Sequence, residues 1–186
     1  MKKAIIFTLL LIIVVTISFF SYENMQFKNY VSSNEKTETN NMNIPVNSNA
    51  PVKSKGEIII EAPVEKVWQV LTTINDWPSW QSEVTESILN GEPKEGAEFK
   101  WKAGGLSFSS KIHTNHRLKE FGWTGKTFGA SAIHNWFFSE ENGKTVIKVE
   151  ESLQGVFPKL FKNYFQKNLD NGIQANLNDL KRASEK

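Results

Sequence analysis

Hydrophobic residues follow three different patterns along the chain. The first twenty residues, MKKAIIFTLLLIIVVTISFF, contain an uncharged run of 17 residues from Ala4 to Phe20. Residues 21–54 show no sustained period and are rich in Asn, Ser, Thr, Glu and Lys. From about residue 55 onward, short alternating runs are followed by one long helical stripe, over a length typical of a single folded domain. The pattern therefore divides the chain into residues 1–20, 21–54 and 55–186.

Residues 1–20 are predicted to be a transmembrane anchor. A helix that spans a bilayer needs about 20 apolar residues, with about 17 as the lower limit. A cleaved signal peptide is the alternative, but the run ends in Ser-Phe-Phe-Ser-Tyr-Glu, a poor cleavage site. Lys2 and Lys3 favour a cytoplasmic N-terminus, which places the rest of the chain outside the cell membrane, or secreted after cleavage. Residues 21–54 are predicted to form a flexible polar stalk.

The third region predicts an α+β domain. GEIIIEA is typical of a strand, and Ala62-Pro63 then opens a helix whose apolar residues recur at helical spacing to Thr73. A long amphipathic helix begins at Val156 and keeps its apolar stripe for about seven turns. Between the helices, turn signals separate six strand-like runs, at residues 83–89, 97–103, 106–117, 121–127, 130–139 and 145–153. We expect a curved antiparallel sheet of about seven strands wrapped around the long C-terminal helix.

Strand alternation predicts which side chains face the inside of the curved sheet. In the run from Leu106 to His116 the even positions carry the apolar residues, so His113 is predicted to face solvent. All six Trp fall between Trp68 and Trp136. The inner surface, together with the aromatic residues of the last helix, is predicted to bind a ligand through Phe99, Trp101, Phe108, Ile112, Trp123, His134, Trp136, Phe138, Val149, Glu151, Phe157, Phe161 and Phe165.

A hairpin signal sets the register of the last two strands. Asn142-Gly143 is a strong two-residue turn sequence, and with it as the loop His134 lies directly opposite Glu151 on the inner face. Such a pair is either a self-satisfied structural element or a polar handle for a ligand. It also makes His134 and Glu151 the candidate acid–base residues of an enzyme, although no nucleophile completes a catalytic set.

Composition narrows the range of functions. The chain has no Cys, which excludes disulfides and thiolate chemistry. Without Lys2 and Lys3, basic and acidic residues number 20 each, so no basic face for nucleic acid is expected. His113 and His116 point to opposite sides of a strand, and His134 with Glu151 gives fewer ligands than a zinc site uses. No metal or cofactor is expected.

The order of these elements resembles the START-like (SRPBCC) superfamily, in its polyketide cyclase/dehydrase and lipid-transport branch. The resemblance is carried by EIIIEAPVEKVWQVLTTINDWPSWQSEV, by FGWTGK and HNWFF on neighbouring strands, and by the long C-terminal helix. It covers about residue 55 to the C-terminus and implies a helix-grip fold with a cavity between the sheet and the helix.

Three functional hypotheses follow. The leading one is binding of a small hydrophobic or amphipathic, lipid-like molecule by a domain tethered outside the membrane, because the inner face is aromatic and no catalytic set is complete. The second is a cyclase, dehydratase or hydrolase that uses His134 and Glu151. The third is a protein-interaction domain of the cell envelope, which a large exposed apolar patch would favour.

Overall fold

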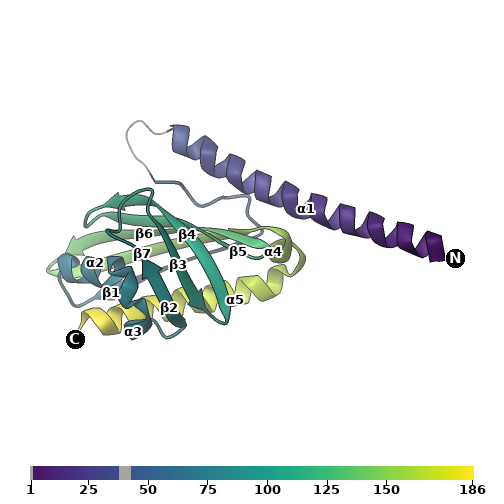
Figure 1. Ribbon diagram of the computed structural model, residues 1–186. Helices are drawn as coiled ribbons and strands as arrows, with labels where there is room; N and C mark the ends of the chain where they lie inside the picture. The colour runs from purple at the N-terminus through teal and green to yellow at the C-terminus, as the bar shows by residue number, and fades with distance from the viewer. Residues whose placement is uncertain (1, 38–42) are drawn as a thin grey trace.

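The computed structural model describes residues 2–37 and 43–186. A long N-terminal helix precedes an α+β domain in which a curved sheet grips the C-terminal helix (Figure 1). The elements are α1 (Lys2–Thr37), β1 (Val52–Ile60), α2 (Val64–Thr72), the 3-10 turn η1 (Ile74–Asp76), α3 (Trp77–Trp80), β2 (Val84–Leu89), β3 (Glu98–Ala103), β4 (Leu106–His116), β5 (Glu120–Thr127), β6 (Ala130–Glu141), β7 (Lys144–Gln154), α4 (Val156–Leu160) and α5 (Lys162–Ser184). The predicted α+β helix-grip fold is confirmed.

The sheet has seven antiparallel strands in the order β1-β7-β6-β5-β4-β3-β2. Consecutive hairpins join β3 to β7, while β1 returns to pair with β7 at one edge. Helices α2 and α5 cover the concave face (Figure 1). Each predicted strand is present with its boundaries shifted by a few residues, and β1 begins at Val52, four residues before the GEIIIEA run.

Helix α5 packs closely on β1. A Cβ atom at Gly56 would lie 2.7 Å from Leu177 Cδ1 and 2.9 Å from Ile173 Cγ2. Glycine in the middle of a strand often marks such a close approach. Leu177 and Ile173 are almost fully buried, so this contact is a central part of the core.

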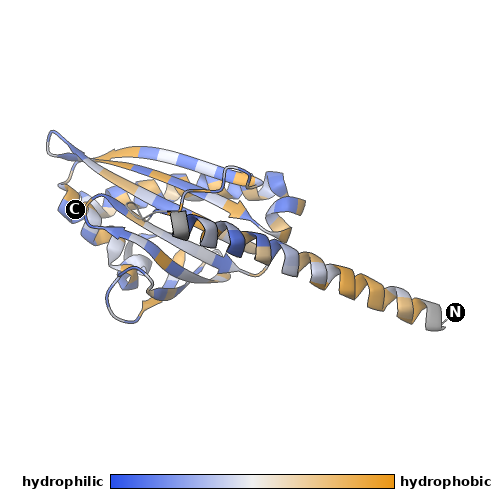
Figure 2. Ribbon diagram, turned by 90° about the horizontal axis from the view of Figure 1, so that it is seen from above, coloured by the Kyte–Doolittle hydropathy of each residue, from blue (hydrophilic) through white to orange (hydrophobic). Residues whose placement is uncertain are grey.

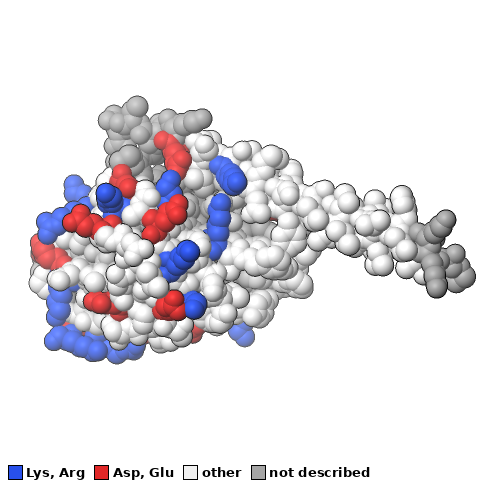
Figure 3. Space-filling view, viewed as in Figure 1, with Lys and Arg blue, Asp and Glu red and all other residues white. Residues whose placement is uncertain are grey.

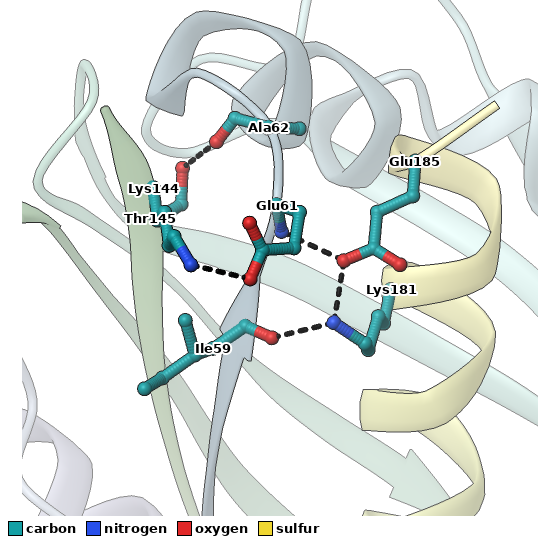
Figure 4. Close-up of polar contacts among 7 residues, drawn as sticks. All are labelled: Ile59, Glu61, Ala62, Lys144, Thr145, Lys181 and Glu185. Atoms are coloured by element: carbon teal, nitrogen blue, oxygen red, sulfur yellow. Dashed lines mark hydrogen bonds and ion pairs between the residues drawn. The ribbon is translucent and has the colours of Figure 1, made fainter. Parts of the chain in front are cut away.

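Polar contacts fix the C-terminal end of α5 to the edge of the sheet (Figure 4). Lys181 Nζ donates to the carbonyl of Ile59 (2.8 Å), and the backbone N–H of Glu61 donates to Glu185 Oε1 (2.7 Å). Lys144 Nζ forms an ion pair with Glu61 Oε1 (2.6 Å). These contacts join α5, β1 and the β6–β7 hairpin at the end of the molecule far from α4.

The prediction of one continuous helix from Val156 is wrong. Helix α4 ends at Leu160, and Phe161 leaves helical geometry with φ −120° and ψ 44° before α5 begins at Lys162. The break changes the direction of the side chains that precede it. The aromatic stripe therefore does not form a single surface over the sheet.

Residues 21–54 also differ from the expected flexible stalk. Helix α1 continues to Thr37, and residues 43–50 lie along the convex face of β6 and β7. Asn135 Nδ2 donates to the carbonyl of Ile44 (2.9 Å), and Phe27 packs with Ile44 and Ile133 in a small apolar cluster. Residues 38–42 of the expected stalk lie outside the described residues. In Figure 2 the apolar part of α1 extends away from the domain, and its more polar part lies beside the sheet.

Candidate functional site

The concave face carries a continuous aromatic core. Trp77, from the short helix α3, is fully buried against Phe99 and Trp123, with ring centroids 5.5 Å away in both contacts. Trp101 and Phe108 stack on each other at 4.4 Å at the edge of this core and are only partly buried. Offset and edge-to-face contacts of this kind stabilise an interior beyond their buried area.

His134 and Glu151 lie opposite each other in the β6–β7 ladder, in the predicted register. His134 Nδ1 donates to Glu151 Oε2 (2.8 Å). The imidazole is buried and lies between two indole rings, with centroids 4.4 Å from Trp123 and 5.4 Å from Trp136. The carboxylate and the two indoles thus fix both the tautomer and the plane of the ring.

Two side chains of β6 in this core each have a ring nitrogen with no hydrogen-bond partner among the described residues. These nitrogens are His134 Nε2 and Trp136 Nε1, and both are buried. An unpaired buried polar group costs about 1–3 kcal/mol. With Nδ1 donating to Glu151, Nε2 of the neutral imidazole can accept a hydrogen bond, while the indole N–H can only donate. A hydroxyl or carboxylic acid group has the chemistry to satisfy both.

Eleven of the predicted ligand-binding residues lie on or at the edge of the concave face. Phe99, Ile112, Trp123, His134, Trp136, Phe138 and Val149 are buried, whereas Trp101, Phe108, Glu151 and Phe165 are partly buried. Phe157 and Phe161 are not part of this surface. Phe157 packs against Phe20 of α1 and Phe128, and Phe161, at the helix break, contacts Phe157 and is exposed. The prediction that Phe157 and Phe161 line the ligand-binding surface is therefore wrong.

Two grooves lie outside the concave face. One, of about 700 Å³, runs between α1 and the convex face of β2–β5. Its charged lining consists of Lys28, Glu35, Glu98, Lys100, Lys111 and Lys126. Figure 3 shows charged side chains of both signs over these strands, next to α1. The other, of about 300 Å³, lies between α2, α3 and the end of α5.

Two hydroxyl groups of β4 are engaged in other contacts. Ser110 Oγ accepts a hydrogen bond from Trp101 Nε1 (3.0 Å), and Thr114 Oγ1 lies 2.7 Å from His113 Nδ1. Within the described part of the chain, no group of three metal-ligating side chains occurs.

His113 does not face solvent as predicted. The β4–β5 ladder has a bulge between Ile112 and Thr114, which places the His113 ring over Gly122 on the convex face. A Cβ atom at Gly122 would lie 2.6 Å from that ring and 2.7 Å from Asn135 Oδ1. Burial, with a smaller effect from His134, lowers the pKa of His113 to about 3. A glycine inside a strand was the sequence signal for this close approach.

A family model described as polyketide cyclase/dehydrase and lipid transport matches residues 51–185. The chain belongs to this family. The match begins just before β1 and ends just after α5, so the polyketide cyclase/dehydrase and lipid-transport domain is the whole helix-grip unit, without α1. A search of curated proteins finds no match.

Solved structures share the fold of this family. A hypothetical protein from Helicobacter pylori is 19% identical, covers 80% of this chain and 98% of its own, and superposes with a TM-score of 0.68. A START superfamily protein from Mycobacterium smegmatis is 10% identical over 72% of this chain and 97% of its own, with a TM-score of 0.59. The Zhui aromatase/cyclase from Streptomyces sp. R1128 is 12% identical over 72% and 93%, with a TM-score of 0.60. At these identities the likeness establishes the fold alone.

Proposed function

We propose that the concave face binds a small hydrophobic or amphipathic molecule that carries one hydroxyl or carboxyl group. The observation that carries the proposal is the pair of unpartnered buried nitrogens, His134 Nε2 and Trp136 Nε1, inside an aromatic core. Ligand sites are mostly apolar with a few polar groups, and here two polar nitrogens lie in an aromatic core. The START-like family and its aromatic core support hydrophobic ligand binding in the same way.

Entry of the ligand requires side chains at the edge of the core to move. Trp101, Phe108 and Phe165 are partly exposed, whereas Trp77 and Trp136 are fully buried against their neighbours. Partly exposed side chains lose fewer packing contacts when they change rotamer. We therefore place the entry between β3–β4 and the first turns of α5.

Binding is tested by titrating the full chain, in lipid nanodiscs, with the polyene fatty acid cis-parinaric acid. Trp fluorescence should be quenched to saturation after subtraction of the empty-nanodisc signal. His134→Phe keeps a ring between the two indoles but removes the acceptor, so its Kd should rise about tenfold, the effect of one lost hydrogen bond. His116→Gln, on the same sheet but outside the aromatic core, is the matched control and should bind normally. Quenching that does not saturate, or that is equal in wild type and His134→Phe, contradicts the proposal.

Residues 1–20 are proposed to anchor the domain in a membrane with the domain on the extracytoplasmic side. Helix α1 is long and apolar enough to cross a bilayer, and Lys2 and Lys3 favour a cytoplasmic N-terminus. Because the chain has no Cys, Lys148→Cys should be the single site labelled by a membrane-impermeant maleimide on intact cells. Labelling only after lysis would place the domain in the cytoplasm.

An enzymatic function is the alternative, favoured by the His134–Glu151 contact. A carboxylate that orients an imidazole and leaves its other nitrogen unpaired is suited to general acid–base catalysis. In that case His134→Gln and Glu151→Gln should each abolish turnover of a polyketide-like substrate while the thermal unfolding midpoint changes little. A lowered midpoint without any activity to lose assigns the pair to structure or ligand binding.

A further inference from the structure

A group of large apolar side chains is exposed where α1 leaves the domain. We call the four residues of this group the basal patch. They are Phe128 in the β5–β6 turn (78% exposed), Leu160 at the end of α4 (62%), Phe161 between α4 and α5 (57%) and Tyr164 in the first turn of α5 (67%). A contiguous exposed apolar surface of this kind marks a contact with a partner or a membrane.

The basal patch is continuous with α1. Phe20 contacts Phe128, with ring centroids 5.5 Å apart, and Phe157 at 5.9 Å. Phe157 in turn contacts Phe161 at 6.5 Å. Figure 1 shows α4 beside α1 at the point where α1 projects beyond the sheet. The exposed apolar surface of α1 therefore continues onto the domain without interruption.

An ion pair fixes α1 against α4 at the same level. Lys159 Nζ lies 2.8 Å from Glu23 Oε1 and 5.7 Å from the centre of the Phe19 ring. These aromatic and ionic contacts on one face of α1 restrict the angle at which the domain meets the helix. The basal patch is thereby held at a fixed position along the axis of α1, level with Phe19 to Glu23.

The length of the apolar run places that position at the edge of the bilayer. Ala4 to Phe20 comprises 17 residues, which span about 25 Å as a helix, against a hydrocarbon core of about 30 Å. The run is therefore at the short end of the length that crosses a bilayer. Aromatic and apolar side chains at the level of Phe20 compensate for such a mismatch when they enter the interface, where Tyr is favoured.

We propose that the basal patch lies in the outer interface of the bilayer, so that the domain rests on the lipid surface. This inference depends on the proposed membrane anchor and not on ligand binding. The partner is the lipid surface itself, because the patch continues the apolar surface of α1. Tyr164 contacts Phe165, one of the residues at the proposed entry, so a lipophilic ligand would pass from the bilayer to the core without crossing water.

The absence of Cys permits a direct test of depth. Single Cys residues at positions 128, 160, 161 and 164 are labelled with NBD, and the full chain is reconstituted in phosphatidylcholine vesicles. The quencher is a phosphatidylcholine spin-labelled near the headgroup end of its acyl chain. Val15→Cys, in the apolar run, is the positive control. Ile59→Cys is the matched negative control, because Ile59 is 52% exposed at the opposite end of α5 (Figure 4).

The four patch labels should be quenched several-fold more strongly by the spin-labelled lipid than the label at Ile59. Phe161→Glu should lift the patch and remove the quenching at position 128, whereas Ile59→Glu should leave it unchanged. Patch labels that remain as accessible to aqueous iodide as the Ile59 label, while Val15 is quenched by lipid, overturn the inference and leave the anchor standing. Absence of lipid quenching at Val15 overturns both. The parinaric acid titration is independent of either result.

Discussion

The two faces of the sheet are covered in different ways. The concave face is covered by α2 and α5, whose apolar stripes join one large core that contains most of the aromatic residues of the domain. Over β6 and β7, the convex face is covered by the second half of α1 and by residues 43–50, through the small cluster of Phe27, Ile44 and Ile133 and a few hydrogen bonds. The difference suggests a folding core on one side and a docked layer on the other.

The largest expected effect is a difference in the free energy of unfolding between a variant in the concave core and a variant in the convex cover. Leu177→Ala removes a buried side chain that touches Gly56, and should lower the free energy of unfolding by about 2–5 kcal/mol. Ile44→Ala removes an equally buried side chain, but should cost only about 1 kcal/mol. Residues 43–50 can detach locally while the sheet stays folded. The stability lost in Ile44→Ala therefore cannot exceed the free energy with which this segment docks. Urea unfolding of the full chain in detergent micelles measures both.

Limited proteolysis provides the control for this comparison. Ile44→Ala should increase cleavage between residues 43 and 50 without affecting the rest of the domain, and Leu177→Ala should increase cleavage throughout it. Equal losses of stability in the two variants would show that the convex cover belongs to the same cooperative unit as the core.

A smaller effect is expected from a glycine under the convex cover. Gly122→Ala introduces a methyl group 2.6 Å from the His113 ring and 2.7 Å from Asn135 Oδ1, so one of the two must move. Overpacking of this kind should lower the free energy of unfolding by about 1–3 kcal/mol. Gly172→Ala is the control: nothing lies within 4 Å of its Cβ position in α5, so it should stabilise the helix by about 0.5–1 kcal/mol. Similar destabilisation in both would argue against a packing constraint at Gly122.

The concave face could be predicted from sequence because its constraints are periodic. Alternation placed Trp123 and Trp136 inside, and Asn142-Gly143 alone fixed the register that brings His134 to Glu151. A two-residue turn determines every pair in the hairpin, so one local signal was sufficient.

The convex face could not be predicted in the same way. Residues 43–50 dock through the carbonyl of Ile44 and the amide of Asn47, contacts that leave no hydrophobic period. The bulge at His113 reverses the alternation within β4, and the break at Phe161 interrupts a stripe that looks continuous in sequence. The bulge and the helix break are single backbone irregularities, invisible to periodicity, that change the direction of the residues around them.

The smallest expected effect is a pH dependence of the free energy of unfolding, caused by His113 on the convex face. The pKa of His113 is about 3 in the folded chain, against an ordinary value of 6.5, because burial disfavours the imidazolium. Between these values the unfolded chain binds a proton that the folded chain does not, so stability is complete above pH 6.5 and decreases as the pH falls through this window. From pH 6.5 to 5.5, where carboxyl groups hardly titrate, the loss should stay below about 1.4 kcal/mol. His113→Gln cannot take up the proton, so the stability difference between wild type and variant should shrink as the pH falls. A difference that stays constant across this range would mean that His113 is solvated in the folded chain and that the convex layer leaves water access to β4.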